Sequence, residues 1–373
     1  MKILQTILVT AGGTAGHTIP AIELSNELII RNYKIIFITD RRMFNFVKNN
    51  VKYDNTNIKV ICFKGRGLYK NKIFKNIKSI LLLIFAIVQA FQIILIHRPI
   101  IGYGFGGGIT VAPLLICNLF KIPIILHEGN IVIGRANKFL SKYARILTTF
   151  FPTIEGVFPK TVKIKFIGMP VRKSIELIGK NKYEIRDNEF INILITGGSL
   201  GAEVMATEIA RALSSFPKEL INKISIVQQV RKENIAYVKN LYENAFIKYK
   251  LKSYIENFSE SLNWCHLIIC RSGAGTIAEN LISGRPAIMI PLPTASDNHQ
   301  MKNALSIKNI GAGWIISNNE LFDHKKLKIK LKGIIFNKVI LYEAAKLAKK
   351  NSVKGSTKTL ADIGQEFIKE NYK

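Results

Sequence analysis

The chain has 373 residues, 48% apolar and 21% charged, which excludes a disordered protein and is long enough for two α/β domains. Its four cysteines are scattered, with no Cys-x-x-Cys pair, which predicts a reducing cytoplasm and no structural metal. The first residues already resemble a strand, so we expect no cleavable leader.

The net charge of +29 raises the question of a nucleic-acid partner. Lysines are spread from Lys34 to Lys373, however, and no aromatic residues are set between basic residues on strands, as RNA-binding sheets would require. A composition bias, an anionic membrane surface or anionic substrates explain the charge better. We therefore expect no nucleic-acid partner.

Strand-like runs alternate with helical stretches, a pattern typical of βαβ units and parallel sheets. In the first half a helix is predicted from Pro20 to Arg31. The strands predicted there are Ile3–Thr10, Lys34–Thr39, Ile58–Phe63, Ile93–His97, Ile122–His127, Ile146–Thr149 and Lys163–Ile167.

The polar stretch Lys173–Phe190 resembles a linker, and a second set of elements follows it. The strands predicted in this half are Ile191–Thr196, Ile224–Gln228, Leu267–Cys270 and Ala287–Ile290, and the helices are Ala202–Ser215, Thr276–Ser283, Leu341–Lys350 and Thr357–Glu370. The sequence thus predicts an α/β protein with two Rossmann-like domains, 1–170 and 171–354, and a tail, 355–373, that packs back on the first domain.

The run Ile80–Ile96 is almost as apolar as a membrane span, but Gln89 and Gln92 interrupt it. A buried helix leading into a core strand gives the same pattern. The preceding stretch, Tyr69–Lys78, places Ile73, Phe74 and Ile77 on one helical face among lysines. It is either an ordinary amphipathic helix or a basic membrane-contact patch.

Four glycine-rich turns follow strand-like runs, at Gly12–Gly16, Gly104–Gly108, Gly197–Gly201 and Gly273–Gly275. Backbone N–H groups of such turns, with the positive end of the next helix, bind anions. The first turn and Asp40, at the end of the second strand, are compatible with a dinucleotide-binding dehydrogenase. That interpretation explains neither His17 nor the second set of glycine turns.

Six motifs, in order, resemble one family, the bacterial cell-wall glycosyltransferases that form lipid II. They are GGTAGHTIPA (Gly12–Ala21), HEGNIVIGRANKFL (His127–Leu140), GMPVR (Gly168–Arg172), GGSLGA (Gly197–Ala202), CRSGAGTIAE (Cys270–Glu279) and DNHQMKNA (Asp297–Ala304). The resemblance implies a GT-B fold, in which the two domains face a cleft. It also implies inverting, metal-independent transfer of N-acetylglucosamine (GlcNAc) from UDP-GlcNAc to the 4-hydroxyl of a lipid-linked muramoyl-pentapeptide (lipid I).

The resemblance also implies a donor site. Arg172 and Ser199 are expected to stabilise the diphosphate, Glu279 the ribose, and Ile255 the uracil, while Gln300 and Asn303 bind the sugar. The remaining donor residues implied are Thr14, Ala15, Gly16, Asn130, Ala274, Gly275, Thr276, Ile277 and Ala278. The chain has no Asp-x-Asp motif for Mg²⁺, and neither a metal nor another cofactor is expected.

In the acceptor domain the general base is left open between His17 and Glu128. The residues expected to bind the acceptor, including its lipid diphosphate, are Gly13, Gly106, Gly107, His127 and Asn137. Gly129 stands where the family usually has glutamine, and Ile109 where it usually has an aromatic residue, which suggests altered acceptor contacts.

Such an enzyme would act in peptidoglycan synthesis, and hence in cell shape and division. It would lie as a peripheral protein on the cytoplasmic face of the inner membrane, with an anionic membrane surface and other cell-wall synthesis proteins as partners. A related glycolipid synthase and a UDP-GlcNAc epimerase on the same scaffold remain alternatives.

Overall fold

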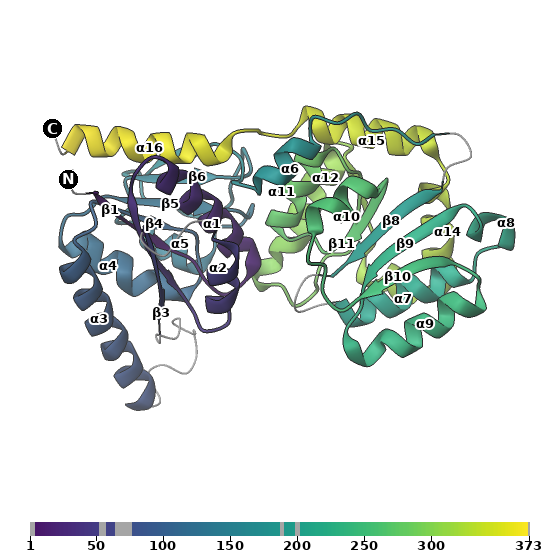
Figure 1. Cartoon of the computed structure of the whole chain (residues 1–373), viewed down its shortest axis with the longest axis horizontal. Coiled ribbons are helices and arrows are strands. Elements are labelled where there is room, and N and C mark those ends of the chain that lie inside the picture. The colour runs from purple at the N-terminus through teal and green to yellow at the C-terminus, as the bar shows by residue number, and fades with distance from the viewer. Residues whose placement is uncertain (1–3, 52–56, 64–76, 187–189, 198–201, 372–373) are drawn as a thin grey trace. The chain divides into compact units, whose positions relative to one another are not determined.

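The structure, a computed structural model, describes every residue except 1–3, 52–56, 64–76, 187–189, 198–201 and 372–373 (Figure 1). The chain divides into two compact units. Unit 1 contains Met1–Arg172 and Val353–Lys373, and unit 2 contains Lys173–Ser352. Each unit has its own parallel sheet with helices packed on it, so the prediction of two Rossmann-like domains is confirmed.

In its described part, unit 1 has a seven-stranded parallel sheet in the order β3-β2-β1-β4-β5-β6-β7. The strands are β1 (Thr6–Thr10), β2 (Lys34–Thr39), β3 (Ile58–Cys62), β4 (Ile101–Gly104), β5 (Ile124–Glu128), β6 (Ile146–Thr149) and β7 (Lys163–Phe166). The central strands are almost fully buried, which is why they appear in the sequence as apolar runs rather than alternating ones.

Helices cover both faces of this sheet. They are α1 (Ala15–Ile30), α2 (Phe44–Asn50), α3 (Ile77–His97), α4 (Val111–Leu119), α5 (Arg135–Leu140) and α16 (Ser356–Asn371). Side chains of α1 and α16 share a core with Val9, Phe37 and Tyr103 on one face. Side chains of α3, α4 and α5 pack with Leu8 and Ile36 on the other.

The described part of unit 2 has a six-stranded parallel sheet in the order β10-β9-β8-β11-β12-β13. Its strands are β8 (Ile191–Thr196), β9 (Ile224–Gln229), β10 (Lys248–Lys252), β11 (Leu267–Cys270), β12 (Ala287–Met289) and β13 (Gly313–Ile315). Its helices are α6 (Lys173–Ile178), α7 (Ala202–Ser214), α8 (Lys218–Ile221), α9 (Ile235–Asn244), α10 (Phe258–Trp264), α11 (Ala274–Ser283), α12 (His299–Asn309), α13 (Asn318–Phe322), α14 (His324–Ile335) and α15 (Lys338–Lys350).

Several predicted elements differ from the structure. Ile93–His97 is the end of α3 and not a strand, because an apolar run without a period cannot distinguish a helix from a buried strand. The glycine-rich β4 was predicted as a turn, and β10 was missed because Lys248, Lys250 and Lys252 make its sequence polar. Pro20 lies inside α1 rather than at its start.

Candidate active site

The first glycine turn joins β1 to α1 and positions His17 in the first turn of that helix. The His17 Nδ1 atom lies 3.0 Å from the carbonyl oxygen of Gly12. A carbonyl oxygen only accepts hydrogen bonds, so we assign the proton to Nδ1 and leave Nε2 unprotonated. The half-buried ring therefore has a basic nitrogen directed away from the Gly12 carbonyl.

The second glycine turn, after β4, packs directly against the first. A Cβ atom added to Gly107 would lie 2.7 Å from the Gly12 oxygen, and one added to Gly106 would lie 3.2 Å from His17 Nε2. Both glycines also have positive φ values, +95° at Gly106 and +87° at Gly107. The structure thus brings together Gly106, Gly107 and His17, three residues that the sequence predicted for one site.

Asp40 is the residue of this cluster whose part the sequence did not reveal. Its Oδ2 accepts a hydrogen bond from the Gly13 N–H at 2.5 Å, and its Oδ1 accepts from the N–H groups of Arg42 and Met43. The N–H of Gly13 is therefore already used within the chain, and the expected contact of Gly13 with the acceptor stays a prediction. The sequence did show an acid at the end of this strand, but it was interpreted only as compatible with dinucleotide binding.

The start of α1 remains suited to an anion. Thr14 is its N-cap, with an extended backbone and no capping hydrogen bond from its side chain. The N–H groups of Ala15 and Gly16 lie in the first turn, where a helix has no internal acceptor for them. Thr14 and Gly16 are exposed, so this end of α1 can be reached by a charged ligand.

Glu128 lies at the end of β5 with a buried carboxylate, 2% exposed. One oxygen accepts from the backbone and side-chain amides of Asn130, at 3.0 and 3.2 Å. The other accepts from the Gly134 N–H and from Asn137 Nδ2, both at 2.9 Å. Four donors thus surround the carboxylate, which is the environment of a group that holds its neighbours in place.

His127 is a core residue, 3% exposed, and its expected contact with the acceptor stays a prediction. Its Nδ1 lies 3.0 Å from Thr148 Oγ1 and its Nε2 3.3 Å from Met169 Sδ. Burial, with a smaller contribution from the nearby charge of His17, lowers the pKa of His127 to about 3. Asn137, also predicted to face the acceptor, is 2% exposed and donates to Glu128 and to the His127 carbonyl.

In unit 2 the corresponding turn leads from β11 into α11, whose N-cap is Gly273. Ala274, Gly275 and Thr276 form the first turn of α11, followed by Ile277 and Ala278. Glu279 lies beyond the first turn and is 6% exposed. The missed neighbour Arg271, just before this turn, donates to the carbonyls of Ile290 and Pro291.

The segment before α12 has two consecutive residues in the left-handed region, Asp297 (φ +52°) and Asn298 (φ +53°). Gln300 Oε1 accepts from the Leu292 N–H at 2.9 Å. Asn303 is fully buried and donates to the Ser272 carbonyl at 3.2 Å, and its expected contact with the sugar stays a prediction. Strained backbone of this kind is typical of binding loops.

Three other predicted donor residues are less defined. Ile255 is buried between β10 and α10, and Arg172 is half-buried at the end of the first segment of unit 1. Ser199 lies outside the described residues. No group of three or more His, Cys, Asp or Glu side chains that could hold a metal occurs in the described part of the chain.

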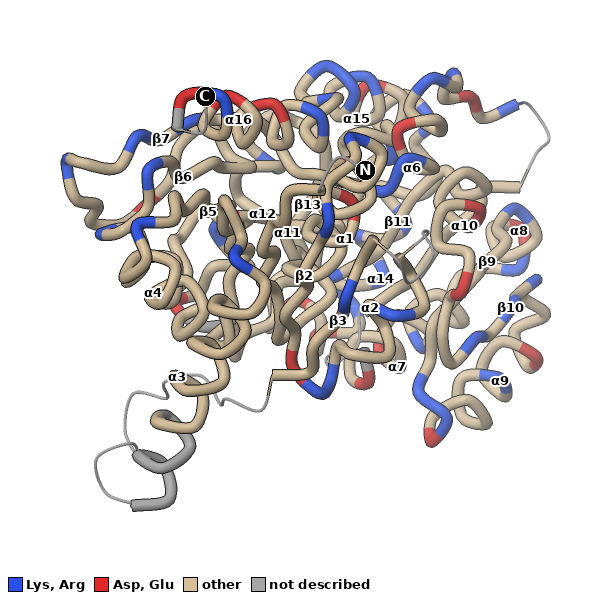
Figure 2. The backbone as a smooth tube through the Cα atoms, turned by 60° about the vertical axis from the view of Figure 1, so that its left-hand side comes forward, with Lys and Arg blue, Asp and Glu red and all other residues tan. Residues whose placement is uncertain are grey.

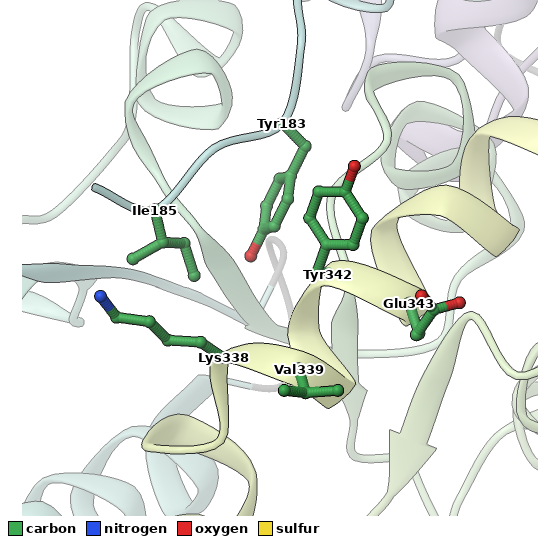
Figure 3. A pocket seen from close by; sticks show the side chains of 6 residues that line it. All are labelled: Tyr183, Ile185, Lys338, Val339, Tyr342 and Glu343. Carbon is green, nitrogen blue, oxygen red and sulfur yellow. The ribbon is translucent and has the colours of Figure 1, made fainter. Parts of the chain in front are cut away.

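Unit 2 also has a surface pocket of about 270 Å³, and none of its lining residues is a predicted site residue (Figure 3). The Tyr183 and Tyr342 rings face one another across it, with centroids 6.5 Å apart. The other lining residues are Ile185, Lys338, Val339 and Glu343. The Tyr183 hydroxyl donates to the His266 carbonyl, so this ring is fixed by the fold.

In unit 1, the part of α3 from Ile84 to Ile96 has no charged side chains (Figure 2). Its inner face packs Ala86, Ala90 and Ile94 into the core. Among the described side chains of its outer face, the exposed apolar ones are Ile84, Phe85, Ile87, Val88, Phe91, Leu95 and Ile96. Within the described residues, no helix is both long enough and apolar enough to cross a membrane.

Large exposed apolar patches are commonly found at protein–protein or membrane contacts. Lys70, Lys72 and Lys75, which the sequence predicted to flank this face, lie outside the described residues.

Comparison with known proteins assigns both units to one family. Residues 7–148 match the Glycosyltransferase family 28 N-terminal domain, and residues 192–360 match its C-terminal domain. The crystal structure of Acinetobacter baumannii MurG has a similar fold, with a TM-score of 0.76 and 23% identity over 97% of this chain and 99% of that one. The GT-B fold predicted from the sequence motifs is thereby confirmed.

Two bacterial relatives are similar over almost the full length. The enzyme of Rhodospirillum rubrum is 33% identical over 358 residues, covering 96% of this chain and 90% of its own. That of Paramagnetospirillum magneticum is 33% identical over 359 residues, covering 96% and 95%. The chain therefore belongs to glycosyltransferase family 28, in the group of UDP-N-acetylglucosamine–N-acetylmuramyl-(pentapeptide) pyrophosphoryl-undecaprenol N-acetylglucosamine transferases.

Proposed function

We propose that the chain transfers GlcNAc from UDP-GlcNAc to the 4-hydroxyl of muramoyl-pentapeptide diphospho-undecaprenol, with inversion at the anomeric carbon. The observation that carries this proposal is the similarity to transferases of that activity over 96% of the chain. The dehydrogenase, epimerase, glycolipid-synthase and nucleic-acid-binding alternatives have no comparable support. The product would be lipid II, the precursor used in peptidoglycan synthesis.

In this proposal the donor nucleotide binds at the carboxyl ends of β8 and β11, as in other open α/β sheets. The first turn of α11 supports the nucleoside, Glu279 the ribose hydroxyls, and Ile255 the uracil. Arg172 and Ser199 stabilise the negative charge that develops on the leaving diphosphate. Gln300 directs its amide to the sugar, while Asn303 holds the Ser272 carbonyl in place.

Residues of unit 1 are also proposed to contact the substrates. Thr14, Ala15 and Gly16 offer the start of α1 to a phosphate, and Gly106 and Gly107 leave space for the acceptor next to His17. Asn130 reaches toward the donor sugar, and Glu128 fixes its orientation. The buried Asn137 donates to Glu128 and so helps to hold the same loop.

His17 is the general base of the proposed reaction. Its Nε2 takes the proton from the acceptor hydroxyl, and the hydroxyl oxygen forms a bond to the anomeric carbon of GlcNAc. The bond from that carbon to the UDP oxygen breaks, and UDP leaves with the electron pair. Glu128 is the weaker candidate, because four hydrogen-bond donors already surround its carboxylate.

His17→Ala and Glu128→Gln distinguish the two bases. We expect His17→Ala to lower kcat by about 100-fold to 10,000-fold with little change in the KM for UDP-GlcNAc. Glu128→Gln replaces an acceptor oxygen by a donor and should mainly destabilise the loop around Asn130 and Asn137. An intact kcat in His17→Ala would remove His17 as the base.

The reaction itself is tested by measuring UDP release with and without the lipid acceptor. The proposal predicts UDP release only when the acceptor is present. One UDP should form for each UDP-GlcNAc that is consumed. Conversion of UDP-GlcNAc to its epimer in the absence of acceptor would contradict it and favour the epimerase.

The outer face of α3 is proposed to contact the anionic membrane that holds the acceptor, on the cytoplasmic side of the inner membrane. Its apolar side chains would enter the boundary between headgroups and acyl chains, as interfacial helices do. The lysines of the preceding stretch would add attraction to anionic lipids.

A further inference from the structure

The peptide group between Gly12 and Gly13 is hydrogen-bonded on both of its sides. Its carbonyl oxygen, on Gly12, accepts from His17 Nδ1 at 3.0 Å. Its N–H, on Gly13, donates to Asp40 Oδ2 at 2.5 Å. One rigid peptide plane therefore connects a carboxylate at the end of β2 to the imidazole at the start of α1.

We propose that Asp40 is a positioning residue for the reaction and acts on His17 through the Gly12–Gly13 peptide group. This proposal rests on the assignment of His17 as the general base. Asp40 touches neither substrate. It takes the place that a carboxylate bonded directly to the imidazole has in other enzymes, with a peptide group inserted between the two.

The physical reason is the polarisation of hydrogen bonds in series. A carboxylate that accepts from a peptide N–H increases the negative charge on the carbonyl oxygen of the same peptide. That oxygen then holds the Nδ1 proton of His17 more firmly, which fixes the tautomer with Nε2 free. It also stabilises the imidazolium that forms when Nε2 takes the acceptor proton.

Glycines around the Gly12–Gly13 peptide group allow its partners to approach closely. A Cβ atom on Gly12 would lie 2.9 Å from Asp40 Oδ2, and one on Gly107 would lie 2.7 Å from the Gly12 oxygen. Gly13 has φ +89°, a conformation that only glycine adopts without strain. These approaches leave the peptide group fixed between its two partners.

The titratable and charged groups that face this hydrogen-bonded chain come from two further elements. His127 on β5 faces His17, and it remains uncharged near neutral pH because burial lowers its pKa to about 3. Arg42 approaches Asp40 with its guanidinium 3.8 Å from Oδ2, and its own side chain is largely exposed.

A double-mutant cycle tests the proposal. Asp40→Asn should lower kcat by about 10-fold to 100-fold, as loss of a residue behind a reactive group often does. In a His17→Ala background the same substitution should change kcat by less than about 2-fold, because the imidazole on which Asp40 acts has been removed. An equal decrease of kcat in both backgrounds would overturn the proposal and leave Asp40 a purely structural residue.

Asp323→Asn is the matched control. Asp323 accepts from the Lys326 N–H at 3.0 Å and caps α14 in unit 2, so the substitution removes the same charge from a helix start far along the sequence. Its kcat should equal that of the natural chain. A fall in kcat as large as that of Asp40→Asn would mean that loss of such a cap, rather than the route to His17, explains the effect.

Two further measurements report the chemistry rather than the fold. Removing the Asp40 charge should move the acid limb of the kcat/KM profile to lower pH by about 0.5 to 1 unit, because Nε2 becomes less basic. Imidazole ¹⁵N shifts should show the proton of His17 on Nδ1, and Asp40→Asn should reduce the population of that tautomer. An unchanged acid limb together with an unchanged tautomer would contradict the proposal.

The failure of this proposal can be told apart from failure of the base assignment. Loss of activity in His17→Ala with an additive effect of Asp40→Asn overturns the role of Asp40 alone. Full activity in His17→Ala overturns the base assignment and the role of Asp40 with it.

Discussion

At the scale of single residues, two neighbouring histidines have opposite environments. His17 is half-buried, with Nδ1 bonded to the Gly12 carbonyl, whereas His127 is enclosed by Thr148, Met169 and Phe105. Of the two rings, only that of His17 is partly exposed. The sequence favoured both histidines for the site because both occur in motifs, and the motifs do not reveal which ring is enclosed by the core.

The buried His127 predicts a pH dependence of stability. Its pKa in the folded chain, about 3, lies below its ordinary value of about 6.5, so the unfolded state binds one more proton between these values. Its contribution to stability is therefore fully present above about pH 6.5. It is lost as pH falls, by about 1.4 kcal/mol per pH unit, and His127→Gln should reduce the slope by this amount.

Hydrogen exchange of β5 amides at several pH values measures this slope. Fluorescence would report the wrong unit, because Trp264 and Trp314 both belong to unit 2. An equal slope in the natural chain and in His127→Gln would contradict the prediction.

At the scale of elements, α16 returns the chain to unit 1 and packs against α1. Arg31 Nη1 donates to Asp362 at 2.6 Å and to Gln365 at 2.7 Å. The buried Tyr103 hydroxyl of β4 approaches α16 so closely that a Cβ atom on Gly364 would lie 1.7 Å from it. Gly364 is thus the position where α16 contacts the core of the sheet.

Gly364→Ala should therefore destabilise unit 1 by about 3 kcal/mol, since the buried phenol has no room to move. Tyr103→Phe removes the clashing oxygen and should restore much of the stability in the double variant. Gly333→Ala is the control, because Gly333 lies inside α14 with nothing within 4 Å of an added Cβ, and it should stabilise unit 2 by about 0.5–1 kcal/mol. Hydrogen exchange measures the free energy of unfolding of each unit. An unchanged stability of unit 1 in Gly364→Ala would contradict the close contact between Gly364 and Tyr103.

The outer face of α3 gives the second prediction at this scale. Phe85→Asp and Phe91→Asp, at positions 49% and 40% exposed, should lower binding to phosphatidylglycerol vesicles by about 10-fold or more. Val339→Asp on α15, 72% exposed, is the control and should bind as the natural chain does. Cosedimentation measures the affinities, and unchanged binding of both α3 variants would remove the membrane role of this face.

At the scale of the whole molecule, the sequence predicted two parallel-sheet domains because their central strands are continuous apolar runs. It failed at α3, where an exposed apolar helix has the same composition as a buried strand, and at β10, where lysines conceal an edge strand. Of the site, it identified the glycine turns and His17. It could not show that Asn137, Asn303 and His127 are buried, or that Asp40 binds Gly13, because these depend on packing between distant segments.

The charge of the whole molecule is distributed rather than focused. Lysines and arginines lie on elements of both units, including α9 and β7 (Figure 2). This distribution over the described residues agrees with a composition bias that acts on exposed positions of both units.

The proposed transfer of GlcNAc to the lipid acceptor can be tested by following labelled sugar. Purified protein is incubated with UDP-GlcNAc labelled in the sugar and with muramoyl-pentapeptide diphospholipid, and the lipid fraction is analysed by NMR. We expect labelled GlcNAc in the lipid fraction, joined by a β-linkage to the 4-oxygen of the muramoyl residue. Donor turnover without label in the lipid, or an α-linkage in the product, would contradict this expectation.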